Sequence, residues 1–175
     1  MVEPWLRGTL TEIDALRRQV LHALELAAED VASWCAVLPG HEMEWKPSGL
    51  PSVGFQLRHM ARSLDRLMTY AEGQQLSAAQ LSALQTEADP ASRDATLLEF
   101  AKAIELATVR VRRVDPGSYE AVRGVGRQAL PTTVGGLLIH CAEHTQRHVG
   151  QAITTAKIVM ALRNEKGLTA EGWDG

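Results

Sequence analysis

Apolar residues recur at alternating steps of three and four along four long segments, and this period constrains the fold more than any other feature of the chain. The first segment runs from about Thr9 to Leu38, and Thr9 with Glu12 has the spacing of a capping box. Its apolar stripe consists of Val20, Leu24, Ala27, Val31, Trp34 and Leu38. This spacing predicts a helix with one apolar face, and four such helices cover each other's faces in a bundle.

Proline and glycine residues between the segments set the expected boundaries. The second helix is expected from about Ser52 to Glu72, the third from about Arg93 to Val114 and the fourth from about Pro131 to Leu162. Pro131 suits a first helical turn, where its missing N–H costs nothing. Residues 77–88 are predicted to form a short extra helix or an ordered loop between the second and third helices. The chain is therefore interpreted as one all-α domain covering residues 1–175.

Composition and charge exclude several classes of protein. The formal net charge is −3, and the chain lacks the basic stripe that nucleic-acid-binding proteins carry. It has no stretch of about 18 uncharged apolar residues, which argues against a membrane span, and its start does not resemble a signal peptide. Cys35 and Cys141 form neither a CxxC motif nor a disulfide framework. We therefore expect a cytoplasmic protein with both thiols in its core, which binds neither nucleic acid nor membrane.

The segment HCAEHTQRHVGQ, residues 140–151, carries three histidines at intervals of four. Residues four apart on a helix differ by about 40° in direction and about 6 Å in height, so two such imidazoles can bind one metal ion. His148 lies about 30° and His144 about 70° from the centre of the apolar face, whereas His140 lies about 110° away. Because buried imidazoles need polar partners, His144 and His148 are either metal ligands or a hydrogen-bonded core pair.

A third ligand has to come from another helix, and His59 on the second helix is the natural candidate. It lies about 120° from the centre of its helix's apolar stripe, a direction that favours an edge or surface position. If His59 does bind metal, the site lies in a groove between helices and is open to solvent. His140 is the alternative third ligand, and His22 and His41 are expected on the surface.

Several residues near these histidines are candidates for supporting roles. Three arginines step by four along the second helix: Arg58, Arg62 and Arg66. A solvated face is the favoured interpretation, and the alternative is a set of cations for an anionic thiol cofactor, with Arg66 nearest to His59. Gln151 lies one turn after His148, where it could hydrogen-bond an imidazole and fix its orientation, and His140 could do the same.

Two motifs and the order of the helices resemble the DinB/YfiT-like family of metal-binding four-helix bundles. The motifs are EWKPSGLPSVGFQLRHMARSLDRL, residues 44–67, and LLIHCAEHTQRHVGQ, residues 137–151. The resemblance implies an up-down-down-up bundle, often dimeric, with nickel or zinc held by His59, His144 and His148. It also implies one of the family's activities, which include thiol transfer with bacillithiol, mycothiol-dependent isomerisation of maleylpyruvate and metal-dependent hydrolysis.

Three neutral imidazoles leave at least one coordination position free, which is typical of a catalytic metal site. The ion could acidify a water molecule for hydrolysis or bind a low-molecular-weight thiol as its thiolate. Neither Glu143 nor Asp65 is placed as a general base, which weakens the hydrolase interpretation, although the first and third helices could supply a carboxylate. The expected function is metal-dependent thiol transfer or hydrolysis on a small-molecule substrate. The alternatives are a non-catalytic metal-binding stress-response protein and a helical oligomerisation module.

Overall fold

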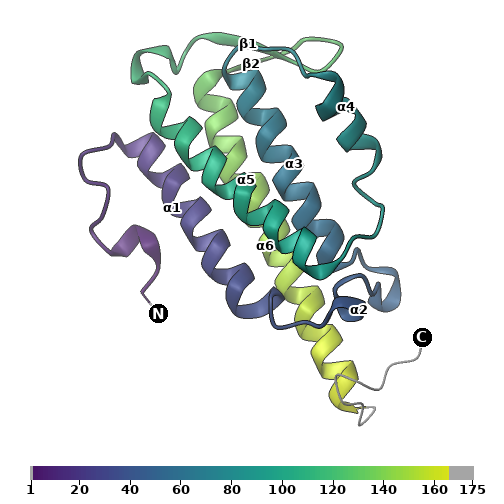
Figure 1. Cartoon of the computed structure of the whole chain (residues 1–175). Helices are drawn as coiled ribbons and strands as arrows, with labels where there is room; N and C mark the ends of the chain where they lie inside the picture. Colours follow the sequence, from purple (N-terminus) through teal and green to yellow (C-terminus); the bar gives the residue numbers. More distant parts are fainter. Residues whose placement is uncertain (1, 166–175) are drawn as a thin grey trace.

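The computed structural model describes residues 2–165, and this part of the chain is mostly helical (Figure 1). The α-helices are α1 (Ala15–Asp30), α2 (Gly40–Met43), α3 (Val53–Ala71), α4 (Ala78–Gln85), α5 (Arg93–Arg113) and α6 (Val134–Glu165). Short 3-10 turns cover Pro4–Leu6, Pro47–Gly49 and Pro116–Ser118, and a π-helical turn covers Val31–Cys35. Two strands, β1 (Val122–Val125) and β2 (Leu130–Thr133), pair antiparallel with Val122 opposite Thr133.

The long helices α1, α3, α5 and α6 pack around a single core. Both α3 and α1 contact α5 and α6, so each long helix has two neighbours. Cys35 and Cys141 lie in this core as predicted, and burial raises the pKa of each thiol to about 12.

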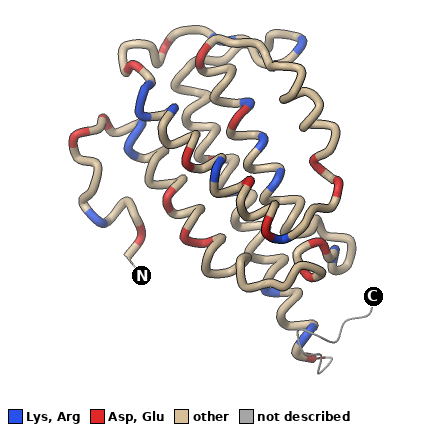
Figure 2. Tube along the Cα trace, viewed as in Figure 1, with Lys and Arg blue, Asp and Glu red and all other residues tan. Residues whose placement is uncertain are grey.

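Figure 2 shows acidic and basic residues interspersed along the chain, in agreement with the absence of a basic stripe. None of the described helices is both long enough and apolar enough to cross a bilayer.

Local capping explains why two helices begin where the sequence predicts. Ser52 and Ser92 precede α3 and α5, and each side chain accepts a hydrogen bond from the backbone N–H three residues later, at 3.1 and 3.3 Å. The short extra helix is also confirmed as α4, which opens with a capping box between Ser77 and Gln80.

The first helix begins later than predicted, so the proposed capping box at Thr9 and Glu12 is wrong. Asp14 caps α1 instead, because its Oδ1 accepts a hydrogen bond from the N–H of Arg17 at 3.3 Å. The Asp14 side chain also accepts a 2.6 Å hydrogen bond from the hydroxyl of Tyr119, which follows α5. The start of α1 therefore depends on a contact distant in the sequence, which no local pattern reveals.

The predicted apolar stripe of the first helix changes register at the π-helical turn. The N–H of Ala36 donates to the carbonyl of Val31 at 2.9 Å, a turn one residue wider than that of an α-helix. Cys35 consequently takes the core position and is fully buried, whereas Trp34, assigned to the stripe from the sequence, is 39% exposed. The Trp34 ring instead lies 4.1 Å from the Nζ atom of Lys157.

Pro131 does not start the last helix, contrary to the sequence prediction. It lies in β2, and α6 begins three residues later at Val134. Thr133 Oγ1 accepts a hydrogen bond from the N–H of Gly136 at 3.0 Å, as an N-cap does. The side chain of Arg123 in β1 donates a hydrogen bond to the Ala71 carbonyl at 2.9 Å. This contact holds the hairpin against the end of α3.

Arg58 is 1% exposed, so the predicted solvated face of the three arginines is wrong. Its guanidinium binds both carboxylate oxygens of Glu44, just after α2, and donates to Thr96 Oγ1 on α5 at 3.2 Å. Its Nε also donates to the backbone carbonyl of Glu87 at 3.4 Å. A buried cation needs such compensation, and here it ties three separate segments to α3.

The other two arginines are also paired. Arg62 binds Glu99 of α5 through Nε at 2.7 Å, and its Nη1 donates to the Ala83 carbonyl of α4 at 2.9 Å. Arg66 binds the carboxylate of Glu87. This face of α3 therefore holds the segment between α3 and α5 in place.

Gly54→Ala is expected to destabilise the protein by about 2 kcal/mol or more. A Cβ at this position would lie 2.2 Å from Glu44 Oε1 and 3.0 Å from Arg58 Nη1, so the ion pair would have to separate. Gly150→Ala is the matched control, because it also replaces a helical glycine but meets nothing within 4 Å. This control should be neutral or stabilising by up to about 1 kcal/mol. Urea unfolding measures both changes, and equal stability of the two variants would contradict the role assigned to the pair.

Candidate metal centre

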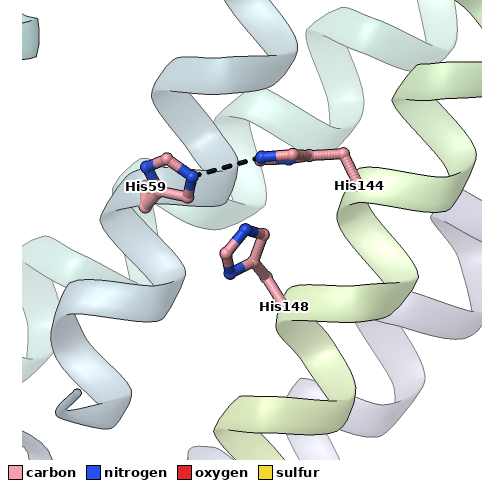
Figure 3. Close-up of side chains that lie close together, drawn as sticks. All are labelled: His59, His144 and His148. Carbon is pink, nitrogen blue, oxygen red and sulfur yellow. Dashed lines mark hydrogen bonds between the residues drawn. The ribbon is translucent and has the colours of Figure 1, made fainter.

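Three imidazoles meet where α3 packs against α6. His59 comes from α3, and His144 and His148 come from successive turns of α6; Figure 3 shows the rings directed toward one another. One ligand-capable atom from each residue lies within 4.8 Å of those of the other two. The structure therefore brings together the three residues that the resemblance implied.

The distances suit a divalent ion bound by imidazole. Nε2 of His59 lies 3.2 Å from Nε2 of His144. Two nitrogens bound tetrahedrally to zinc at 2.0–2.1 Å lie about 3.3 Å apart, so this pair is already close to the required separation. The ring centroids of His144 and His148 are 4.4 Å apart, and those of His59 and His148 are 4.5 Å apart. Zinc and nickel both accept a donor set of this kind.

His59 is oriented by a buried carboxylate. Its Nδ1 lies 2.8 Å from Oε2 of Glu87, whose side chain is also bound by Arg66. Although burial raises the pKa of Glu87, the hydrogen bonds from His59 and Arg66 bring it below its ordinary value. An ionised Glu87 accepts the Nδ1–H proton of His59, which leaves the lone pair of Nε2 facing the other two histidines.

His148 is oriented by a neutral amide. Its Nδ1 lies 2.6 Å from Oε1 of Gln56, a residue of α3 that is only 2% exposed. The carbonyl oxygen of the amide accepts the Nδ1–H proton, so Nε2 of His148 is again the nitrogen left for a metal. Gln151 interacts with the same imidazole, since its hydrogen bond acts to raise the pKa of His148.

The environment of the site keeps the imidazoles of His144 and His148 neutral. Burial, followed by the charges of His148 and His59, lowers the pKa of His144 to about 4. Burial and the charge of His59 also lower the pKa of His148, and the positive charge of Arg147 acts in the same direction on both residues. Neutral imidazole is the form that binds metal, so protons compete weakly for these ligands near neutral pH.

The remaining histidines lie outside the cluster. The His140 ring is 5.6 Å from that of His144 between centroids, and its Nδ1 lies 3.6 Å from the exposed carboxylate of Glu143. His140 is therefore not part of the group that could hold a metal, whereas His59 is.

His41 is exposed as expected, but His22 is 4% exposed, and its Nε2 lies 3.3 Å from the hydroxyl of Thr9. The surface position predicted for His22 is wrong because α1 turns that side of its helix toward the core.

Sequence reasoning missed Glu87 and Gln56. Glu87 follows α4 in a segment without a regular apolar pattern. Its position next to His59 depends on contacts with Arg58 and Arg66, which the sequence does not reveal. Gln56 carried a usable signal, since it is a polar residue among the apolar positions of α3 and lies three residues before His59. A buried amide next to a candidate ligand is a common way to orient that ligand.

Comparisons with known proteins identify a family for most of the chain. A family model described as the DinB superfamily matches residues 10–152. The matched range contains all three histidines of the cluster as well as Glu87 and Gln56. No curated protein and no solved structure matches the chain.

Glu87→Gln is expected to weaken zinc binding about tenfold. The amide can still accept the proton of His59, but it carries no charge and leaves Arg66 without its carboxylate. Glu143→Gln is the matched control, because Glu143 is exposed and the one ion pair it forms among residues 2–165 is with His140, outside the cluster. Competition with a chromophoric chelator gives both dissociation constants. An unchanged constant for Glu87→Gln would show that the carboxylate does not support the metal.

Proposed function

Because the chain belongs to the DinB superfamily, we propose that it is a metal-dependent enzyme whose divalent ion is held by His59, His144 and His148. The observation that carries the proposal is the convergence of one imidazole from α3 and two from α6 within 4.8 Å. Nickel and zinc are both compatible with three imidazoles, and the substrate is a small molecule. Because the family it resembles is often dimeric, we also propose that the chain forms a homodimer.

We also assign the chain the up-down-down-up order of DinB-like bundles. In Figure 1, α1 and α6 run in one direction, and α3 and α5 run in the other. Each long helix contacts two of the others, which supports a closed bundle of four. In this arrangement α3 and α6 are antiparallel neighbours, so a short stretch of each helix supplies all the ligands.

When bound, a divalent ion supplies Lewis-acid chemistry, lowering the pKa of a coordinated water or thiol. The chain's residues prepare the donors for this role. Glu87 and Gln56 hold the Nδ1 protons of His59 and His148, so that both Nε2 atoms face the centre of the cluster. Arg66 balances the charge of Glu87 and fixes the position of its carboxylate.

Thiol transfer is supported better than hydrolysis. Hydrolysis requires a carboxylate or another base free to take a proton from water. The carboxylate adjoining the cluster is that of Glu87, and its oxygens are occupied by His59 and Arg66. A thiol bound as its thiolate needs no further base at the moment of attack. A low-molecular-weight thiol is therefore the proposed co-substrate.

Alanine substitution of His59, His144 or His148 is expected to reduce bound zinc or nickel from about one ion per chain to well below that value, because two imidazoles bind such ions much more weakly than three. His140→Ala is the control and should retain the metal. Elemental analysis of untagged protein gives the content directly. Metal loss in His140→Ala equal to that in the other variants would overturn the ligand assignment. A wild-type protein that stays nearly metal-free after zinc or nickel is supplied would favour the helical oligomerisation module.

Transfer of a low-molecular-weight thiol to a chromogenic electrophile is expected to require the metal. Activity should disappear in His148→Ala and after chelation, and readdition of zinc or nickel should restore it in the wild type only. Far-ultraviolet circular dichroism checks that the variant remains helical. Activity that survives complete metal removal would show that the ion is not the catalyst. Stoichiometric metal without turnover of any thiol tested would favour the non-catalytic metal-binding protein.

A further inference from the structure

A pocket of about 350 Å³ lies between α6 and the start of α3. Gln56 precedes His59 by three residues on α3, and Gln151 follows His148 by three on α6, so the pocket begins about 5 Å along the helices from the ligands. Its lining includes Leu50, Pro51, Gln56, Arg147, Gln151 and Thr154. Its volume lies within the range of small-molecule sites.

Within the described part of the chain, one arginine of the pocket has no carboxylate partner. Among residues 2–165, Arg58, Arg62 and Arg66 pair with Glu44, Glu99 and Glu87. Arg147 is exposed, lines the pocket and forms no ion pair within that part of the chain. Its charge is therefore available to a ligand, whereas Arg66, which the alternative interpretation of the sequence placed nearest to His59 as a cation for a thiol cofactor, is paired with Glu87.

The other polar groups of the pocket suit a small anion held in one orientation. A guanidinium matches a carboxylate through two parallel N–H···O bonds. The amide of Gln151 lies one turn after Arg147 on the same face of α6, where it can donate a further hydrogen bond to the same anion. Leu50 and Pro51 supply an apolar wall for a short carbon chain on the opposite side.

We propose that this pocket binds the carboxylate of a small substrate or co-substrate whose other end reaches the metal centre. The inference rests on the proposed function and adds the class of molecule that it takes. Arg147 is the specificity residue for the anion, and Gln56 adjoins both sites because it lines the pocket and holds His148. The spacing of one helical turn fits a chain of two or three carbons between the carboxylate and the metal-binding group.

The test uses cobalt-loaded protein and two thiols of equal length, 3-mercaptopropionate and its uncharged amide. The absorption band of thiolate bound to cobalt gives both dissociation constants, and their ratio is compared between variants so that the difference in thiol acidity cancels. Arg147→Gln is expected to reduce the preference for the carboxylate about tenfold. Arg113→Gln, which replaces an exposed arginine of α5 outside the pocket, should leave it unchanged.

Gly150→Leu tests the pocket itself, because Gly150 lines it and a Cβ at this position would meet no atom within 4 Å, so a leucine side chain can occupy part of the space. It should weaken binding of 3-mercaptopropionate at least about tenfold with the cobalt content unchanged. Wild-type affinity in this variant, or an unchanged ratio in Arg147→Gln, would overturn the inference while the proposed metal site stands. A wild-type protein that binds no cobalt would overturn the proposed function and this inference together.

Discussion

The packing of α3 against α6 is the contact on which the candidate site depends. Two packed helices place their axes about 8–10 Å apart, so an imidazole from each side spans roughly half the gap. His59 on one helix and His144 and His148 on the other therefore bring their Nε2 atoms into the same small volume. The same packing partly buries the rings and keeps those of His144 and His148 neutral, as binding to a cation requires.

Buried charges around the site form a chain in which each group compensates the next. Glu87 is 8% exposed and is stabilised by Arg66 and by the proton of His59. The backbone of Glu87 is held by Arg58, whose own charge is balanced by Glu44. Removing Arg66 or Glu44 would leave the buried charge of Glu87 or Arg58 without its ionic partner, which costs far more than a surface ion pair contributes. The positions of the candidate metal ligands and the stability of the bundle are thus linked.

Whether the limits of a helix were predicted correctly depended on whether the contacts that fix its ends are local in the sequence. The limits of α3 and α5 were predicted to within one or two residues because Ser52 and Ser92 cap them through hydrogen bonds to the next turn. The start of α1 was mispredicted because Asp14 is stabilised there by Tyr119, more than a hundred residues away. The β-hairpin was missed because strands of four residues are too short to show a clear alternation.

The sequence alone determined the helical class and the pairing of His144 with His148, because the pitch of a helix places residues four apart on one side whatever surrounds them. The tertiary structure decided that His59 and not His140 joins them, and that Glu87 and Gln56 orient the rings. These choices depend on how two helices meet and on which polar groups become buried between them. The apolar period of a single helix does not reveal how that helix meets its neighbours or which polar groups become buried. Sequence patterns therefore indicate candidate ligands, and the packing of the helices decides which of them come together.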